Sequence, residues 1–300
     1  MISVIIASVD EKRLQDVKNN IEETIGVEYE IISFNNGGTD KLGLCEVYND
    51  GAKAAKYNLL CFMHEDISIK TQNWGLEVVN CFKKNPKIGV LGIAGSAYKS
   101  AAPSGWFAES HHTNLLYCNY IQSFKNKGEE SVHYLEKGGK SDIAQAVCVD
   151  GMWFCSQREI AIKHPFDQNL LKGFHGYDID FCLNVIQNGY EVMVSLNILM
   201  EHFSEGGYSK SWFEDTLKLH DKWANFLPVA VIELPDGERN LIEKSGYKWI
   251  LKKMVSMGYS FKDLKLFLKV QKVKGNLSNG SFLKYLYYGF KYSGSNQKKA

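Results

Sequence analysis

The first 66 residues alternate between apolar runs and helical segments, and this order constrains the fold more than any other feature of the sequence. Apolar runs at residues 2–7, 30–34 and 59–63 are separated by two segments whose apolar or small residues recur at helical spacing. Helices that connect consecutive strands are typical of a parallel sheet covered by helices on its faces. The chain is therefore expected to begin with an α/β domain.

The third apolar run leads directly into His64, Glu65 and Asp66. A continuous apolar run indicates a strand that is buried on both faces. In open α/β sheets, ligands bind at the carboxyl ends of the strands, so the two acids are candidates to hold a cation. A solvated strand end is an equally acceptable interpretation, because loops at such ends are commonly polar.

Residues 96–145 show no steady period and contain His111, His112 and His133. A long irregular stretch in a compact chain is often a binding loop or an excursion from the edge of a sheet. The adjacent histidines could ligate a metal. A solvated loop fits them better, because no second pair of ligands lies nearby in the sequence.

Farther along, residues 146–154 resume the sheet, and a helix opens around Asp178 and Asp180. Acids in the first turn of a helix interact favourably with its dipole. Residues two apart on a helix, however, point in different directions. One of the two acids can therefore stabilise the helix while the other faces a cleft.

Charge divides the chain into two parts. Residues 241–300 contain 13 Lys, no Arg and two acids, a net charge of +11, and the first 240 residues carry −10. We expect an α/β domain at 1–240 and a basic, amphipathic helical region at 241–300. Four lysines of the second part, Lys262, Lys265, Lys269 and Lys272, share one helical face. This pattern suggests peripheral contact with an anionic membrane, although a helix packed on the main domain with solvated lysines would look the same.

The seven cysteines form no CxxC pair and mostly lie inside apolar runs. They are expected to be core residues of a protein in a reducing compartment. The N-terminal apolar run is short and lacks a basic flank, and no apolar run approaches the roughly 18 residues of a membrane span. We therefore expect a cytoplasmic protein that contacts the inner face of the membrane at most peripherally, and no nucleic-acid partner.

Five short motifs lie at the ends of the expected strands and the starts of the expected helices. They are Ser-Val-Ile-Ile at 3–6, Asn-Asn-Gly-Gly-Thr-Asp at 35–40, Tyr-Asn-Asp-Gly-Ala-Lys-Ala-Ala at 48–55, His-Glu-Asp at 64–66, and Gly-Tyr-Asp-Ile-Asp-Phe at 176–181 with His202 after the next strand. This ordered set resembles the family 2 glycosyltransferases of the GT-A fold over about residues 1–205, most closely the branch named after a streptomycin-biosynthesis protein. The resemblance implies a Rossmann-like, mixed but mostly parallel sheet flanked by helices.

The same resemblance implies the reaction and its central residues. It implies a nucleotide-diphosphate donor, expected to be a UDP-sugar, and a glycan or lipid-linked hydroxyl acceptor, as in polysaccharide biosynthesis. Asp66 and His202 would hold a divalent metal, Mn²⁺ or Mg²⁺, that neutralises charge on the leaving group. Asp178 would act as the base that takes the acceptor proton in an inverting transfer, with Asp180 as the competing candidate.

The remaining binding residues also follow from the resemblance. Donor contacts are expected from Ala7, Ser8, Asn35, Asn49, His64 and Glu65. Asn35 would face the nucleotide base, because an amide can both donate and accept hydrogen bonds. Gly151 and Trp153 are expected on the acceptor side, where Trp153 would either stack on a sugar ring or belong to the core.

Two rival functions stay open. Among the departures from the family pattern are Asn35 and Asn36 in place of acids, His64 in place of the first acid of a D-x-D motif, and Tyr177 in place of Glu. These departures favour a non-catalytic sugar-nucleotide or glycan-binding module, whereas the retained Asp66, Asp178 and His202 oppose it. The second rival is a metal-dependent nucleotidyltransferase, which would release pyrophosphate rather than a nucleoside diphosphate.

Overall fold

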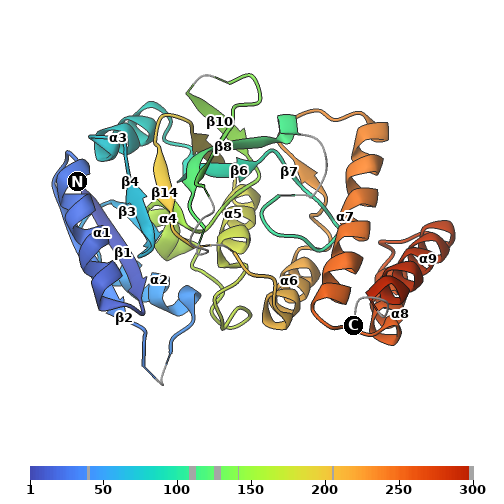
Figure 1. The fold of residues 1–300 in the computed structure, drawn as a ribbon. Coiled ribbons are helices and arrows are strands. Elements are labelled where there is room, and N and C mark those ends of the chain that lie inside the picture. The colour runs from blue at the N-terminus through green and yellow to red at the C-terminus, as the bar shows by residue number, and fades with distance from the viewer. Residues whose placement is uncertain (39–40, 108–112, 125–129, 141, 205, 297–300) are drawn as a thin grey trace.

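The structure, a computed structural model, describes residues 1–38, 41–107, 113–124, 130–140, 142–204 and 206–296 (Figure 1). Its largest sheet has the strand order β10-β13-β5-β12-β3-β1-β2. The strands are β1 (Ile2–Ser8), β2 (Tyr29–Asn35), β3 (Leu59–His64), β5 (Ile88–Gly92), β10 (Ile143–Ala146), β12 (Trp153–Gln157) and β13 (Glu191–Ser195). Only β12 and β10 pair antiparallel to their neighbours, so the sheet is mixed but mostly parallel in direction, as expected.

Helices cover both faces of this sheet. The helices α1 (Glu11–Thr24) and α3 (Trp74–Lys84) pack on one face, and α2 (Leu44–Ala54), α4 (Arg158–Lys163) and α5 (Tyr177–Gln187) pack on the other. Alternate side chains of β3 enter the two cores: Leu60 and Phe62 face α2 and α5, while Cys61 and Met63 face α1 and α3. The apolar run that ends at the acids is therefore buried on both faces, as predicted.

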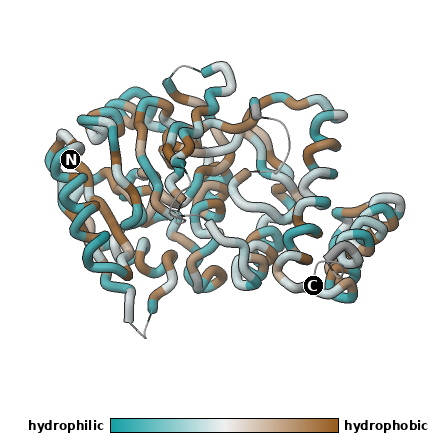
Figure 2. The backbone as a smooth tube through the Cα atoms, viewed as in Figure 1, coloured by the Kyte–Doolittle hydropathy of each residue, from teal (hydrophilic) through white to brown (hydrophobic). Residues whose placement is uncertain are grey.

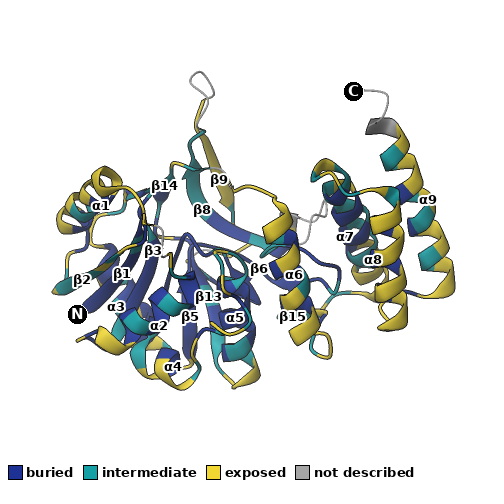
Figure 3. Ribbon diagram, turned by 90° about the horizontal axis from the view of Figure 1, so that it is seen from below, coloured by how far each residue is buried: buried dark blue, intermediate teal, exposed yellow. Residues whose placement is uncertain are grey.

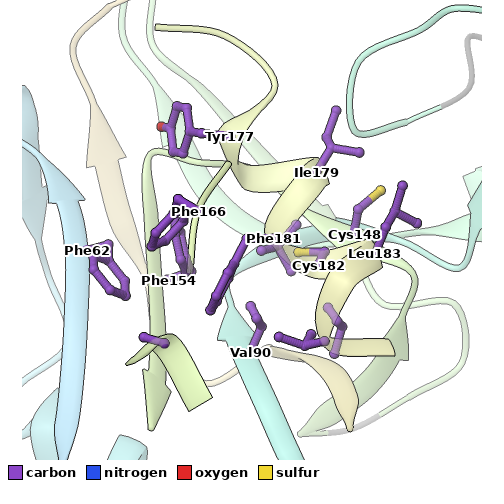
Figure 4. Close-up of a cluster of buried hydrophobic side chains, with 14 of the residues drawn as sticks. Phe62, Val90, Cys148, Phe154, Phe166, Tyr177, Ile179, Phe181, Cys182 and Leu183 are labelled. Atoms are coloured by element: carbon purple, nitrogen blue, oxygen red, sulfur yellow. The ribbon is translucent and has the colours of Figure 1, made fainter. Parts of the chain in front are cut away.

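Aromatic rings dominate the core on the α2 and α5 side (Figure 4). Phe62 and Phe154 lie on adjacent strands with ring centroids 5.1 Å apart, and Phe166 stacks on Phe181 of α5 at 4.4 Å. The backbone is most apolar along these central strands (Figure 2). This packing fixes α5, and with it the two acids of its first turn, against the sheet.

A second sheet, of order β11-β6-β8-β14-β4 with β9 beside β8, crosses the carboxyl edge of the first. It consists of β4 (Ile67–Ile69), β6 (Ala94–Ser96), β8 (Leu116–Gln122), β9 (Val132–Glu136), β11 (Cys148–Val149) and β14 (Met200–His202). A short pair joins β7 (Tyr98–Lys99) to β15 (Val229–Ala230), and a 3-10 turn spans Thr113–Leu115. The stretch 96–145, expected to be irregular, thus contains β7, β8, β9 and the start of β10.

Four helices complete the chain: α6 (Lys210–Lys222), α7 (Asp236–Ser256), α8 (Phe261–Val273) and α9 (Asn279–Asn296). The last three share a core with Phe213 of α6 and lie at the end of the molecule opposite β1 and β2 (Figure 3). The expected division at residue 240 falls inside α7, which begins at Asp236. Across the described residues, none of the helices is both long and apolar enough to cross a bilayer. All seven cysteines are buried and unpaired.

Candidate functional site

Three of the predicted motifs meet at one edge of the large sheet. Ser8, Asn35 and His64 are the last residues of β1, β2 and β3. Ser8 lies opposite Asn35, and Ala7 lies opposite His64. Because these strands are parallel, their carboxyl ends share this edge, where ligands of α/β sheets bind.

A possible metal-binding group lies just beyond β3. Asp66 precedes β4, and the antiparallel pairing of β4 with β14 places Ile67 opposite His202. Asp66 Oδ1 is 3.8 Å from His64 Nδ1 and 3.6 Å from His202 Nε2, and one ligand atom from each residue lies within 4.8 Å of the other two. The same Asp66 oxygen is buried without a hydrogen-bond partner. Two imidazole nitrogens and one carboxylate oxygen therefore fit a divalent cation.

Neighbouring side chains orient His202. Its Nδ1 lies 3.3 Å from Gln122 Oε1, which can only accept, so Nδ1 carries the proton and Nε2 is left to face Asp66. The Ser204 hydroxyl lies 3.2 Å from Nε2. Burial raises the pKa of Asp66, but His64, the Ser204 hydroxyl and His202 together outweigh it and lower the pKa below the ordinary value. The carboxylate is thus kept ionised, as a metal ligand must be.

His64 is oriented by Tyr177. The Tyr177 hydroxyl donates to the carbonyl oxygen of Gly151 at 3.1 Å and lies 2.9 Å from His64 Nε2. Since its proton goes to Gly151, the hydroxyl accepts from His64 Nε2, which leaves the lone pair of Nδ1 toward Asp66. A Cβ atom on Gly151 would lie 2.2 Å from the Tyr177 hydroxyl oxygen, so this contact requires glycine.

A cavity of about 420 Å³ opens beside this group. The two histidines line one part of it, and Asp150, Gly151, Tyr177 and Asp178 line another. Six aromatic side chains also face it: Trp106, Phe107, Tyr120, Phe174, Tyr208 and Trp212. The cavity therefore joins metal ligands, two acids and an aromatic wall in one space large enough for a small ligand.

Asp178 has the properties of an acid–base group. Burial, and after it the nearby Asp150, raise its pKa, while backbone N–H groups of Ile179, Asp178 itself and Gly151 lower it, and the resulting pKa is about 7. A carboxyl that titrates near neutral pH can both accept and release a proton. Asp150 was not singled out from the sequence, but it follows the β11 strand, a position where acids often face a cleft.

Asp180 does not face the cavity. It is buried, and its carboxylate accepts from Trp223 Nε1 at 2.7 Å and from Lys222 Nζ at 2.9 Å. It is absent from the cavity lining. The prediction that Asp180 competes with Asp178 as the base is therefore wrong, because a separation of two residues turns its side chain to the opposite side of α5.

Two side chains that were predicted to contact the nucleotide-sugar, Ser8 and Glu65, form hydrogen bonds within the protein instead. The Ser8 hydroxyl donates to Glu65 Oε2 at 2.5 Å, and the backbone N–H groups of Val9 and Asp10 donate to the same carboxylate at 3.2 and 3.3 Å. Both side chains are buried, and neither lines the cavity. Glu65 thus fixes the loop between β1 and α1, which corrects the expectation that Ser8 and Glu65 point at the donor.

The structure also contradicts the predicted donor contact of Asn49 and the predicted stacking of Trp153 on a sugar. The Asn49 amide donates to the Phe166 carbonyl oxygen and accepts from the Phe166 N–H, both at 2.9 Å, and so joins α2 to a loop away from the cavity. Trp153 is fully buried and packs edge-on against Trp74 at 5.8 Å, so it cannot stack on a sugar. Both follow from the burial of their elements, which spacing alone does not reveal.

The other predicted positions have simpler outcomes. Ala7 and Asn35 lie at the strand edge but do not line the cavity, and their donor contacts stay predictions. Asn35 Oδ1 accepts from the Gly37 N–H at 3.2 Å. His133 is exposed and lies 2.9 Å from Asn119 Oδ1. His111, His112 and the Thr-Asp end of the 35–40 motif lie outside the described residues.

A buried cation that the sequence did not reveal holds the segment at 98–104, which leads into Trp106. Lys99 Nζ donates to the Ser104 carbonyl oxygen at 3.0 Å and hydroxyl at 2.7 Å, and lies 2.9 Å from His220 Nε2. Burial lowers the pKa of Lys99 to about 8. Glu243 of α7 accepts from Tyr98 at 2.7 Å and from the Ala101 N–H at 3.2 Å. This segment is therefore fastened to α6 and α7.

Comparisons with known proteins agree with this geometry. The chain is similar to a solved structure described as GalNAc-T7 with UDP, GalNAc and Mn²⁺, with a TM-score of 0.54, 12% identity, and coverage of 97% of this chain and 57% of that chain. At this identity the likeness concerns the fold, and the chain spans little more than half of that neighbour. A second structure, A197 from STIV, has a TM-score of 0.37 and 16% identity over 68% of this chain and 86% of the other. No curated protein matches the chain.

The family is shown by a sequence model rather than by these neighbours. The model described as "Glycosyltransferase like family" matches residues 3–213, from the first strand to α6. The match includes every strand end and helix start that contributes to the cavity. It confirms the resemblance to glycosyltransferases, while the streptomycin-related branch stays a prediction. The chain therefore belongs to the glycosyltransferase-like family.

Proposed function

We propose that this protein is an inverting, metal-dependent transferase that moves a sugar from a UDP-sugar to a hydroxyl group of a glycan or lipid-linked acceptor. The observation that carries the proposal is one cavity lined by Asp178 and by His64 and His202, the two histidines grouped with Asp66. The His64–Asp66–His202 group can hold a cation near a diphosphate, and Asp178 can take a proton. An inverting, metal-dependent transfer uses both.

The metal group fits a divalent ion, and Mn²⁺ in particular. Two of its three ligand atoms are imidazole nitrogens, whereas Mg²⁺ prefers oxygen ligands. The unpaired buried oxygen of Asp66 is costly unless something binds it. When bound, such an ion neutralises negative charge on the departing diphosphate. The structural neighbour's UDP and Mn²⁺ agree with this choice of donor and metal.

Asp178 is proposed as the base. It would take the proton of the acceptor hydroxyl as that oxygen forms its bond to the anomeric carbon. The bond from that carbon to the phosphate oxygen breaks at the same time, and UDP leaves with the electron pair. Attack from the side opposite the leaving group inverts the configuration at the carbon. With a pKa near 7, Asp178 is partly ionised at neutral pH and is a stronger base than an ordinary carboxylate, which suits a general base.

The departures from the family pattern support an active site rather than a decayed one. His64 and Tyr177 each replace an acid of the pattern, and in the structure they are hydrogen-bond partners 2.9 Å apart. Two replacements that contact each other and orient an imidazole toward Asp66 are a matched pair. This favours the enzyme over the non-catalytic binding module.

The aromatic wall supports a glycan acceptor. Trp106, Tyr208 and Trp212 present flat, rigid and partly exposed faces to the cavity. The apolar faces of sugar rings stack on such surfaces while their hydroxyls bond to polar groups nearby. An acceptor in this place would lie beside Asp178. A location on the cytoplasmic side of a membrane, where lipid-linked acceptors are elongated, completes the proposal.

The test is a transfer assay with a panel of UDP-sugars, Mn²⁺, and oligosaccharide or lipid-linked acceptors. We expect release of UDP that requires Mn²⁺, and a product whose anomeric configuration by NMR is opposite to that of the donor. Retained configuration would overturn the inverting mechanism. Binding of UDP without turnover of any donor would favour the binding module, and release of pyrophosphate would favour the nucleotidyltransferase.

A further inference from the structure

The helix α8 buries the apolar face that the sequence predicted. Leu264, Phe267 and Leu268 are buried in the core shared by α7, α8 and α9. The predicted lysine face, with Lys265 and Lys269, is exposed on the other side. A packed helix with solvated lysines explains this arrangement completely. The lysine face alone therefore says nothing about a membrane.

A second apolar stripe lies exposed on each of the last two helices, although Leu266 and Val270 also line a groove with Leu217 of α6 and Met254 of α7. The stripe consists of Leu266, Val270 and Val273 on α8 and Leu283, Tyr287 and Phe290 on α9, and the exposed fractions of these side chains range from 39% to 88%. Both sets have the same i, i+4, i+7 spacing, so each forms one line along its helix. We call these six residues the α8–α9 face; its helices form the outer, exposed end of the molecule (Figure 3).

The two helices lie side by side. Phe261 of α8 packs against Phe290 of α9 with ring centroids 5.7 Å apart, and Lys272 Nζ lies 5.2 Å from the Phe282 ring. Lys272 of α8 therefore reaches the seam between the two helices and lies against an aromatic side chain of α9.

Its charge is not balanced by acids. The last 60 residues contain 13 Lys and only Glu243 and Asp263 as acids. Glu243 accepts hydrogen bonds from Tyr98 and the loop after it, and Asp263 caps the start of α8 through Ser260. Glu243 is thus held within the fold, whereas Asp263 stays exposed at the start of α8 and Asp221 of α6 pairs with Lys274. The outer surface still carries an excess of cations beside apolar side chains.

We propose that the α8–α9 face docks on an anionic lipid bilayer, with its apolar side chains inserted at the headgroup level and its lysines against the lipid phosphates. Flexible lysines spread along a helix suit a diffuse negative surface, and apolar residues beside them add shallow insertion. A protein partner of fixed shape would more often be met by acids and arginines in defined pairs.

The docked face lies one helix away from the cavity. Trp249 of α7 packs edge-on against Tyr208 at 5.2 Å and Trp212 at 6.0 Å, and both partners line the cavity. Lys253 of α7 lies 4.0 Å from the Tyr208 ring centre. Docking would therefore hold the aromatic wall close to the membrane. Only this consequence, delivery of a lipid-linked acceptor, rests on the proposed function.

The test is flotation of the full chain with vesicles of phosphatidylcholine alone or mixed with phosphatidylglycerol, at low and high salt. We expect binding only to the anionic vesicles, weakened by salt. The variant K265E/K269E should bind them at least about tenfold more weakly, because each lysine near such a surface contributes to binding. A second variant, V273S/L283S/Y287S, should also lose binding, since it removes half of the face.

Matched controls separate these effects from general changes in charge or hydrophobicity. K83E/K84E on α3 makes the same charge change, and L76S/L135S/I162S removes three exposed apolar residues from other elements. Both controls should bind as the unchanged protein does. Binding that is equal for all variants, or none to anionic vesicles, would overturn the proposal. A dimer in solution that V273S/L283S/Y287S converts to a monomer, without vesicle binding, would assign the face to a second copy instead.

The assay distinguishes this inference from the proposed function. The vesicles contain neither donor nor acceptor, so binding is measured whether or not the protein transfers sugar. Both face variants should keep the transfer rate toward a water-soluble acceptor. Vesicle binding without transfer would overturn only the proposed function, and transfer without vesicle binding would overturn only the docking.

Discussion

The carboxyl end of β3 and the first turn of α5 each carry two nearby acids, and in each region the two acids are used differently. At β3, Asp66 turns an unpaired oxygen toward two histidines, while Glu65 is bonded to the loop after β1. At α5, Asp178 lines the cavity, while Asp180 is held by Lys222 and Trp223. One acid in each pair faces the site, and the other stabilises the element that carries it.

The difference has a geometric cause in both regions. Glu65 and Asp66 lie in the bend between β3 and β4, where Glu65 turns back toward the loop after β1 and Asp66 turns toward the histidines. Asp178 and Asp180 are two apart on a helix, so their side chains point in different directions. In each pair, the acid that faces the site therefore has a neighbour that does not. The comparison predicts that substitutions at Asp178 and Asp66 alter chemistry and binding, whereas substitutions at Asp180 and Glu65 alter stability.

The largest expected effect is that of Asp178→Asn on transfer. Loss of a positioned base lowers kcat by about 10²–10⁴-fold. In the unchanged enzyme, kcat should rise with pH through about 7 on the acid side, because the base must be ionised. The variant should lose this acid limb. A variant that keeps activity within tenfold, with the same pH profile, would refute the assignment.

The same substitution should not destabilise the protein. The pKa of Asp178 is raised from 3.8 to about 7, so between these values the folded state binds more protons than the unfolded state, and the free energy of unfolding falls as pH rises. Asn carries no charge and escapes this loss. In metal-free protein at pH 8, the melting temperature of Asp178→Asn should equal or exceed that of the unchanged chain.

The second largest effect is that of Asp66→Asn on metal binding. A neutral amide in place of the carboxylate should weaken Mn²⁺ binding by at least about 100-fold, since even residues that only orient metal ligands are worth 10–100-fold. Calorimetric titration with Mn²⁺, alone and with UDP, measures it. Asp66 Oδ1 accepts no hydrogen bond in the fold, so the protein should still fold, although loss of the interactions with His64, Ser204 and His202 that lower the pKa of Asp66 should cost some stability. Unchanged Mn²⁺ affinity would remove Asp66 from the metal group.

Asp180→Ala is expected to have the third largest effect, on stability. It leaves the buried Trp223 N–H without an acceptor, whereas Lys222 keeps its bond to Asp167 at 2.8 Å, so the cost should be about 2 kcal/mol. Urea denaturation measures it. Asp180→Asn should cost less stability, because it keeps an acceptor for Trp223. It also removes a carboxyl group whose pKa is raised by burial. An Asp180→Ala enzyme that folds normally but is inactive would exchange the roles of the two acids.

The sequence predicted the elements made of local patterns. The runs at 2–7, 30–34 and 59–63 became β1, β2 and β3, because apolar runs bounded by polar loops need no distant partner to be recognised. The second sheet was not predicted. Its pairings join β6 to β8 and β14 to β4, and such long-range pairing leaves no period within residues 96–145.

The site residues likewise include some that the sequence predicted and some that it did not. The order of motifs brought Asp66 and His202 together across 136 positions, and the structure agrees. Tyr177, Asp150 and the buried Lys99 acquire their roles from side chains distant in sequence, so no spacing marks them. Asn49 was predicted to contact the donor but is buried in hydrogen bonds to Phe166, and Trp153 occupies the core position that the sequence left as its alternative.

The smallest effect, that of Glu65→Gln, tests the comparison most sharply because Glu65 is adjacent to Asp66. Glutamine keeps one oxygen that can accept from Ser8 but loses the charge that strengthens the bonds from Val9 and Asp10, so unfolding should become easier by about 1 kcal/mol. Mn²⁺ affinity should stay within twofold by the same calorimetry used for Asp66→Asn. If Glu65→Gln weakened Mn²⁺ binding as much as Asp66→Asn does, the two acids would act as one cation site and the division of roles at the end of β3 would be wrong. If Glu65→Gln loses only stability and Asp66→Asn loses mainly Mn²⁺ binding, the two adjacent acids have separate roles, Glu65 in the fold and Asp66 in the metal group.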